Sequence, residues 1–478
     1  MGINKTVRAA IVVSLMSGLY ASQTLAAGFA LIENSASGMG NAFAGGAAIA
    51  DDASTVWFNP AGMTRLKGEQ ITVAGHIISP KADFTDVGSV FSATTPITGG
   101  TALNGSDDDG GATALVPNFY YVTQLDGEAW FGLGITVPFG LSTEYDEDWI
   151  GRYHATTSEV HSININPSFA FKYNDKLAVG LGLSLQYITA KLENKIDSAI
   201  TCLGVVQSAQ IAGGADLPTA QAAAGAACLP GGAGLIPGTA AQDSSQSLEG
   251  NNWNIGWNVG LLYDLDSASR VGLSYRSSMD ANLEGDVDFT VNPAFQSVID
   301  GLGPLSTFLS DTSVQAGIEL PAQMSVSYVR DVDAKLTVMA DITWTEWSNF
   351  DALVIKFDNL MQPTSTQPEN WEDSYRYAIG ASYKVDDKII VRAGVAIDET
   401  PIPDATDRTA RIPGNDRTWI SLGFGYKIDE NTSVDVGYSH LMVDDTEIDN
   451  TIPLSGQQLI GEYSADVDIL SIQGNYKF

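Results

Sequence analysis

Apolar residues alternate with small or polar residues along nearly the whole chain after residue 68, a period of two that is typical of β-strands. From Leu177 to Tyr187 every odd position is apolar or aromatic, whereas the even positions are small or polar. The same alternation recurs at 253–263, 336–344, 375–383, 389–397, 420–426 and 434–438. Repeated strands with one apolar face predict an all-β protein, either a sandwich or a barrel.

Two details favour a transmembrane barrel over a soluble sandwich. The polar faces carry glycine, serine and charged residues that suit a lumen, including Arg276, Asp341, Arg376, Arg392 and Asp435. The apolar faces end repeatedly in aromatic residues that suit a girdle at the lipid headgroups: Tyr263, Trp344, Tyr383, Tyr426 and Tyr438. Unpaired strand edges cannot be hydrated in lipid, so such a sheet has to close on itself.

Short and long connections alternate between the strands, as they do in outer-membrane barrels with long loops outside the cell. The long connections cover about 81–113, 144–157, 195–248, 287–315, 358–372, 400–415 and 445–460. This arrangement predicts an antiparallel transmembrane β-barrel of about 14 strands. The last nine residues, 470–478, alternate and end in Phe478, which resembles the signal that barrel-assembly machinery recognises.

Composition excludes several functions. The chain has 24 basic and 57 acidic residues, a net charge of −33, yet only 17% of its residues are charged. The absence of a basic surface argues against nucleic-acid binding. The four histidines show no metal-ligand spacing, and no nucleophile elbow or phosphate-binding glycine loop occurs. We therefore expect no enzyme, no cofactor and no metal site, and a barrel wall with few charges. The acidic loops would suit either divalent-cation bridging to lipopolysaccharide or a salty habitat.

The N-terminus reads as an export signal. Lys5 and Arg8 precede an apolar run, 9–21, that is too short to span a bilayer. Small residues before the cleavage point predict a signal peptide at 1–26. Cys202 and Cys228 are the two cysteines, and in an oxidising compartment they could close one loop; the alternative is a pair of free thiols.

Residues 27–67 do not alternate and form a separate segment before the barrel, 68–478. They are rich in glycine, alanine and serine, with a short helix expected near Asp51 to Val56 and a turn at Asn59-Pro60. The segment is too apolar for a flexible linker, since it contains Phe29, Leu31, Met39, Phe43, Trp57, Phe58 and Met63. We expect an ordered plug, or hatch, inside the barrel.

The segment "GFALIENSASGMGNAFAGGAAIADDASTVWFNPAGM" is similar to the hatch of the FadL/TodX family of outer-membrane transporters for long-chain fatty acids and other hydrophobic compounds. The resemblance continues through "VPFGLSTEY", "WNIGWNVGLLYDLD", "WTEWSNF" and "RIPGNDRTWISLGFGYKIDENTSVDVGYSH". It implies a hatch rearrangement that involves Phe29 and the turn at Asn59, Pro60 and Ala61.

Pro138 and Gly140 predict a kink in the third strand, because proline cannot donate to the ladder and glycine often marks a bulge. An ordinary bulge at the barrel rim is the plainer interpretation. The resemblance implies a lateral opening for the ligand at Pro138, Phe139 and Gly140.

The resemblance also implies capture of ligand on the third and fourth long loops. Apolar residues there make candidate contacts, with loop self-packing as the alternative: Leu203, Val206, Phe295, Ile299, Leu302 and Phe308. The candidate carboxylate partners are Lys195, Arg376 and Arg392. The family's headgroup-binding cations do not recur at the expected positions, where Asn194 stands and where 358–372 lacks Lys and Arg. An uncharged hydrocarbon is therefore an alternative ligand.

Together these features predict passive transport of hydrophobic molecules across the outer membrane of a Gram-negative bacterium. We expect a monomer whose partners are long-chain fatty acids or hydrocarbons, outer-membrane lipid and lipopolysaccharide, and the barrel-assembly machinery. The alternatives are an uptake channel for aromatic hydrocarbons or alkanes, and, from a different class, a general porin or adhesion barrel.

Overall fold

The computed structural model describes residues 28–92, 99–125, 127–453 and 455–478, so the predicted signal peptide, 1–26, lies outside the described residues. The strands form a closed antiparallel barrel of 14 strands. Closure occurs where β1 (Glu69–Asp86) pairs with β21 (Gln457–Lys477), from Gln70 opposite Lys477 to Asp86 opposite Gly461. The predicted fold class is confirmed.

Several barrel strands are divided into two segments that follow one another along the wall. In chain order the remaining strands are β2 (Val90–Phe91), β3 (Ala114–Gln124), β4 (Ala129–Thr136), β5 (Gly140–Glu144), β6 (Thr157–Lys172), β7 (Leu177–Ile196), β8 (Ser244–Asp264), β9 (Ser269–Arg276), β10 (Met279–Thr290), β11 (Thr312–Leu320), β12 (Gln323–Asp331), β13 (Leu336–Thr345), β14 (Ala352–Phe357), β15 (Ser365–Pro368), β16 (Ser374–Lys384), β17 (Ile389–Asp398), β18 (Arg417–Lys427), β19 (Thr432–Val443) and β20 (Thr446–Thr451).

The helices belong either to the N-terminal segment or to the loops. The N-terminal segment contains α2 (Ala36–Met39), α3 (Gly46–Ile49), α4 (Thr55–Phe58) and the 3₁₀ helix η1 (Pro60–Arg65). The loops contain α5 (Ser198–Ala212), α6 (Leu217–Cys228), η2 (Ala240–Gln242), α7 (Pro293–Ile299), η3 (Gly303–Thr307) and η4 (Trp347–Asn349). Within the described part of the chain, no helix is long and apolar enough to cross a membrane.

The alternation in the sequence sets which face of each strand points outward. Leu181, Phe169 and Ile255 are 55%, 57% and 71% exposed and lie on the outer wall. The charged residues at alternate positions, such as Asp341 and Arg376, are buried inside the barrel. Lipid can cover the apolar outer face, whereas the polar inner face has to be satisfied by other protein groups.

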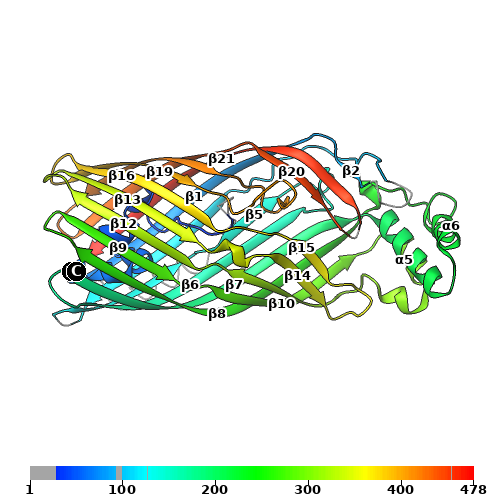
Figure 1. The fold of residues 1–478 in the computed structure, drawn as a ribbon, viewed down its shortest axis with the longest axis horizontal. Helices are drawn as coiled ribbons and strands as arrows, with labels where there is room; N and C mark the ends of the chain where they lie inside the picture. The colour runs from blue at the N-terminus through cyan, green and yellow to red at the C-terminus, as the bar shows by residue number, and fades with distance from the viewer. Residues whose placement is uncertain (1–27, 93–98, 126, 454) are drawn as a thin grey trace.

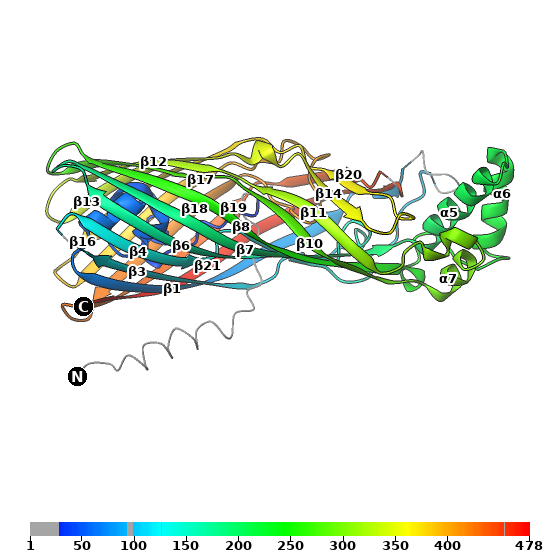
Figure 2. The ribbon, with the colours of Figure 1, turned by 90° about the horizontal axis from the view of Figure 1, so that it is seen from below.

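The two ends of the barrel differ. Figures 1 and 2 show the hatch helices, in dark blue, inside the barrel at the end where the chain terminates, and α5 and α6 beyond the opposite end. The strands extend further into the loops than the alternation indicated. β1 runs to Asp86 and β10 to Thr290, so the long connections that begin there are shorter than predicted.

The hatch follows a different local path from the one expected. The predicted helix near Asp51 to Val56 is wrong in position, because α4 begins at Thr55 and α3 ends at Ile49. Asp52 explains the difference, since its side chain accepts hydrogen bonds from the backbone N–H and the hydroxyl of Ser54 and holds a turn there.

Glycines of the wall make room for the hatch. A methyl group at Gly260 of β8 would overlap the side chain of Asn59, and one at Gly272 of β9 would overlap the carbonyl of Ala47. Only a residue without a side chain allows such close backbone approach. Other wall glycines that contact the hatch in this way include Gly132, Gly180, Gly380, Gly394, Gly423 and Gly437.

Candidate functional site

Asn59 fastens the hatch to the barrel wall. Its side-chain amide donates to the carbonyl of Ala47 at 2.6 Å and to that of Leu261 in β8 at 2.9 Å. Its side-chain oxygen Oδ1 accepts from the backbone N–H of Ala61 at 3.0 Å. Pro60 begins η1, where a missing N–H costs nothing. The Asn-Pro-Ala turn is therefore both a helix cap and an anchor on the wall.

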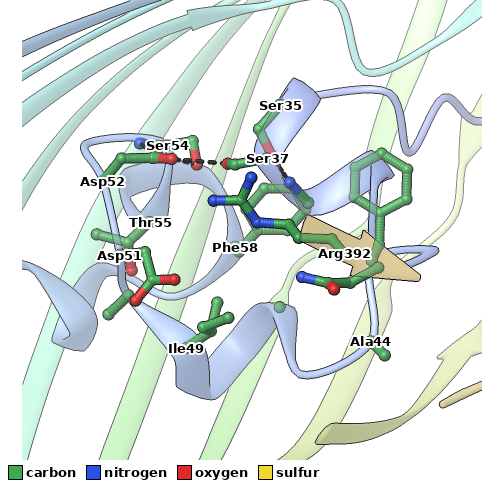
Figure 3. Close-up of a pocket in the computed structure, with 15 residues that line it drawn as sticks. Ser35, Ser37, Ala44, Ile49, Asp51, Asp52, Ser54, Thr55, Phe58 and Arg392 are labelled. Atoms are coloured by element: carbon green, nitrogen blue, oxygen red, sulfur yellow. Dashed lines mark hydrogen bonds between the residues drawn. The ribbon is translucent and has the colours of Figure 1, made fainter. Parts of the chain in front are cut away.

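Arg392 reaches from β17 among the hatch residues (Figure 3). Its guanidinium forms a buried ion pair with Asp435 of β19 at 2.7 Å. It lines a cavity of about 30 Å³ together with Ser37, Asp51 and other hatch residues. A paired cation beside so small a cavity stabilises the hatch, and nothing in this geometry favours Arg392 as a carboxylate partner.

The third barrel strand is broken where the sequence predicts a kink. β4 ends at Thr136, β5 begins at Gly140, and β5 pairs with β6. β3 pairs with β4 only as far as Phe119 opposite Ile135. The hydroxyl of Ser162 in β6 bonds both the N–H and the carbonyl of Phe139.

The first residues of the hatch form hydrogen bonds with backbone groups that have no strand partner at this break. The N–H of Gly140 donates to the carbonyl of Phe29 at 2.9 Å, and the N–H of Leu31 donates to the carbonyl of Pro138 at 2.8 Å. Ala30 and Phe139 form an antiparallel bridge between these two bonds. Residues 29–31 therefore act as a short strand that pairs with the broken wall strand from inside.

The Phe29 side chain occupies an aromatic pocket. Its ring lies 4.9 Å from that of Trp347, 5.9 Å from those of Phe139 and Phe350, and 6.1 Å from that of Trp371. Phe29 is only 3% exposed. The pocket continues into inward-facing residues of the wall, which we name the lumenal apolar cluster: Leu141, Val160, Ile188, Met279, Leu283, Ile318 and Leu320.

Arg376 is the candidate cation whose geometry best suits a carboxylate. Its Nη2 donates to the hatch carbonyl of Ala42 at 2.8 Å, and its guanidinium lies 5.0 Å from the ring of Trp419. Among the described residues, its Nε and Nη1 have no hydrogen-bond partner although they are buried. Buried charged donors normally have partners, so these two are available to an anionic group.

The cavity beside Arg376 also contains Arg417, which the sequence interpretation missed. Arg417 forms an ion pair with Asp398, and both side chains line the cavity with Leu31 and Trp347. Its volume is about 40 Å³, which admits water but no alkyl chain. Arg417 gave no periodic signal, because it is the first residue of β18.

Lys195 lies far from this cavity, at the base of the third long loop. Its ammonium forms an ion pair with Glu147 at 3.1 Å. A second cation that the sequence interpretation missed, Arg411, donates to Ser158 at 2.9 Å and to Asn194 at 3.4 Å. Arg411 thus brings a cation from the sixth long loop to Asn194, where the sequence itself has none.

The apolar loop residues mainly pack on one another. Cys202 and Cys228 form a disulfide that joins α5 to α6, with the Cα atoms 5.9 Å apart. Of the candidate contacts, Leu203, Val206, Phe295 and Ile299 are buried in the loop core, as the alternative of loop self-packing describes. Leu302 and Phe308 are half-buried beside that core.

A further apolar surface lies on the fifth long loop. Leu360 is 91% exposed and Met361 is 37% exposed. The neighbouring Asn359 donates to the carbonyl of Thr307 at 2.7 Å, which holds this loop beside η3 and Phe308. Exposed apolar residues of the fifth long loop therefore lie beside half-buried apolar residues of the fourth.

One buried loop carboxyl has an altered acidity. Glu369 follows β15 and is 4% exposed. Burial raises the pKa of Glu369 to about 8, against the opposing effect of the nearby Arg411. Burial also lowers the pKa of Arg411 to about 10. The fifth long loop thus contains a buried carboxyl whose pKa lies well above its ordinary value.

A closed barrel with a lipid-compatible outer face and an internal hatch defines an outer-membrane protein of the hatch-containing transport class. The chain belongs to the outer membrane protein transport family (OMPP1/FadL/TodX), whose family model matches residues 17–478. The resemblance drawn from the sequence is confirmed, and so is the location in the outer membrane.

Named relatives support this assignment. The chain is 33% identical over 436 residues to the long-chain fatty acid transport protein of Escherichia coli K12, covering 90% of each protein. It is 31% identical to outer membrane protein P1 of Haemophilus influenzae over 437 residues, with 87% of this chain and 86% of the relative covered.

Solved structures show the same fold. A FadL homologue from Pseudomonas aeruginosa superposes with a TM-score of 0.79 at 24% identity and covers 94% of this chain and 100% of its own. The toluene transporter TodX from Pseudomonas putida gives a TM-score of 0.65 at 16% identity, with 94% and 99% covered.

Proposed function

We propose that this protein carries long-chain fatty acids or similar hydrophobic molecules passively across the outer membrane and releases them sideways into the lipid. The observation that carries the proposal is the pairing of residues 29–31 with the broken third strand. One short segment both fills the aromatic pocket with Phe29 and occupies the break in the wall.

Capture begins on the exposed apolar surface of the fourth and fifth loops. Leu360 and Met361 are exposed at this surface, and the half-buried Leu302 and Phe308 lie beside them. An exposed apolar patch on an ordered loop favours ligand binding over a purely structural role. Leu203, Val206, Phe295 and Ile299 keep the loops in place as their core.

Transfer into the barrel follows the lumenal apolar cluster down to Phe29. An alkyl chain that replaces the Phe29 ring would gain contacts with Trp347, Phe350 and Trp371. A carboxylate at the end of that chain would find Arg376 with two donors free for it. Arg417 adds positive charge beside Arg376, although Asp398 offsets part of it.

Displacement of Phe29 also frees the wall. When residues 29–31 move, the N–H of Gly140 and the carbonyl of Pro138 lose their partners, and the break between β4 and β5 opens toward lipid. Pro138 has no N–H with which to restore the ladder to β3. Asn59 keeps η1 on the wall during this movement, so the rest of the hatch continues to block water.

An uncharged hydrocarbon is the second candidate ligand, because the aromatic pocket and the lumenal apolar cluster need no carboxylate. Native mass spectrometry of the purified protein, with fatty acids, alkanes and monoaromatics offered together, separates the two. Retention of an apolar compound supports transport, and retention of none contradicts it. Liposome swelling with sugars tests the general-porin alternative, since rapid sugar passage would contradict a closed hatch.

A further inference from the structure

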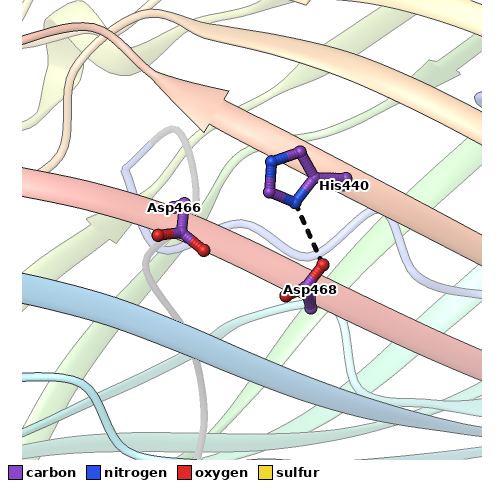
Figure 4. Close-up of side chains that lie close together, drawn as sticks. All are labelled: His440, Asp466 and Asp468. Atoms are coloured by element: carbon purple, nitrogen blue, oxygen red, sulfur yellow. Dashed lines mark hydrogen bonds and ion pairs between the residues drawn. The ribbon is translucent and has the colours of Figure 1, made fainter.

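We propose that the outer wall of the barrel carries a binding site for a divalent transition-metal ion of the zinc type, built from His440, Asp466 and Asp468. These residues come from β19 and β21 and lie together in Figure 4. Their ligand atoms all lie within 4.8 Å of one another. Among the described residues, no other group of three His, Cys, Asp or Glu side chains has its ligand atoms this close together.

The pairing of two neighbouring strands brings the ligands together. His440 lies directly opposite Asp468 in the antiparallel register. Asp466 lies two residues before Asp468 in β21 and therefore projects from the same face. Strand positions in a closed barrel are fixed on both sides by hydrogen bonds, so the three side chains start from rigid backbone positions.

The donor set suits zinc. One imidazole nitrogen and two carboxylates are common zinc ligands, at metal distances of about 2.0–2.2 Å, with water in a remaining position. The His440 Nδ1 already lies 3.0 Å from the Asp468 carboxylate, a spacing that two ligands of one ion can adopt. The Asp466 carboxylate supplies the third potential ligand atom, within 4.8 Å of the other two.

A neighbouring hydroxyl holds one of the ligands in place. The phenol of Tyr438 donates to the same Asp468 oxygen at 2.6 Å. Hydrogen bonds of this kind from outside the ligand set orient metal-binding carboxylates in known sites. Tyr438 stands next to His440 on the outer face of β19, so the arrangement includes ligands and a supporting group.

The local charge also calls for a cation. Asp466 and Asp468 place two carboxylates side by side on the outer face. Lys81 lies opposite Asp466 in the register with β1, yet no ion pair joins them among the described residues. A divalent ion would neutralise both carboxylates at once.

The site lies just beyond the apolar belt of the outer wall. Leu470 and Ile472 follow Asp468 on the same face and are 52% and 61% exposed, as lipid-facing residues are. Asp466, Asp468 and Lys81 form the first polar rows beyond them, on the side of the long loops. The open positions of a bound ion would therefore face the headgroup layer.

The test measures zinc binding by intact protein in non-ionic detergent, purified without a polyhistidine tag and stripped with a chelator. We expect one zinc per chain by equilibrium dialysis, and binding weakened roughly tenfold or more by His440→Asn and by Asp466→Asn. Cobalt in place of zinc should give a visible absorption band that both variants lose. The unchanged heat-modifiable gel mobility of the barrel reports that each variant is folded.

His161 and Glu159 provide a matched control. They form a single pair at 3.4 Å on β6, without a third ligand in reach among the described residues. His161→Asn should leave zinc binding unchanged. Wild-type protein that binds no zinc at micromolar concentrations, or His440→Asn and Asp466→Asn variants that bind as wild type does, would overturn the proposal. Because the site lies outside the lumen, this result is independent of ligand uptake.

Discussion

The backbone N–H of Gly140, at the break in the third barrel strand, donates to the carbonyl of Phe29 at the start of the hatch across 2.9 Å. This bond joins two parts of the chain that are separated by more than one hundred residues. It links the filling of the aromatic pocket to the closure of the wall. A ligand that displaces Phe29 therefore acts on the break through the backbone, without having to contact the wall strand first.

Pro138→Val should slow uptake, because valine supplies an N–H that can extend the pairing of β4 toward β3. We expect a loss of about fivefold, the equivalent of one hydrogen bond of about 1 kcal/mol. Uptake of a labelled fatty acid by cells that lack their own transporter measures it. Pro167→Val in β6, opposite Leu133 of β4, is the control. Equal uptake by wild type, Pro138→Val and Pro167→Val would contradict the role of Pro138.

Gly260→Ala should loosen the hatch, because the added methyl group overlaps the Asn59 side chain. Overpacking of this kind costs about 1–3 kcal/mol. We expect faster hydrogen exchange in 55–65 and a higher ion conductance in planar bilayers. Gly474→Ala on β21 is the matched control, since a methyl group there meets nothing within 4 Å. A Gly260→Ala protein as protected as wild type would show that the anchor at Asn59 is dispensable.

Arg376→Met should separate charged from uncharged ligands. Loss of a charge-assisted hydrogen bond of about 1.5–3 kcal/mol weakens fatty-acid retention roughly 10- to 100-fold. Retention of an alkane of the same length should stay as it is, because no carboxylate is involved. Arg330→Met, at an exposed end of β12, controls for loss of charge alone. If retention of the fatty acid and of the alkane fell equally, Arg376 would support the structure of the hatch and not bind the carboxylate.

The loop that contains Glu369 should become less stable as the pH rises. Burial raises its pKa to about 8, so the folded loop holds a proton that the unfolded segment releases near its ordinary pKa of 4.5. Stability contributed by this group is therefore full below about pH 4.5 and is lost as the pH approaches about 8. Arg411 and Asp407 are the charged groups nearest to it, and they act in opposite directions.

Hydrogen exchange of 365–373 at pH 5, 6.5 and 8, corrected for intrinsic rates, measures this effect. Glu369→Gln keeps the neutral form and should remove most of the pH dependence. Glu372→Gln changes an exposed neighbour and should leave the dependence intact. Equal corrected exchange rates of the wild-type loop at all three pH values would show that Glu369 does not control the stability of this loop.

The wall could be predicted from the sequence because a strand repeats every two residues. Leu181 and Leu183 face lipid as the alternation indicates, and Pro138 marks the break through a local property of proline. The hatch segment was recognised from its small residues and its resemblance to a family. These signals are local or periodic, so a single sequence carries them.

Contacts between distant segments were not predictable in the same way. Whether Phe295 packs in a loop core or faces solvent depends on α5, which lies far away in the chain. His440 gave no metal-ligand spacing because its partners lie on β21, and only the register brings them together. Arg417 and Arg411 likewise reach their sites through the closure of the barrel and the folding of a loop.

The most direct test of lateral release is a reversible disulfide between the hatch and the barrel wall. Ala30 and Phe139 form an antiparallel bridge, which places their Cα atoms at a separation that a disulfide can span. In the double variant Ala30→Cys and Phe139→Cys, the oxidised protein should bind fatty acid at the loops but fail to deliver it. Reduction should restore uptake, with wild type under the same treatment as the control for Cys202–Cys228. Full uptake while the bond is intact would contradict lateral release through this break.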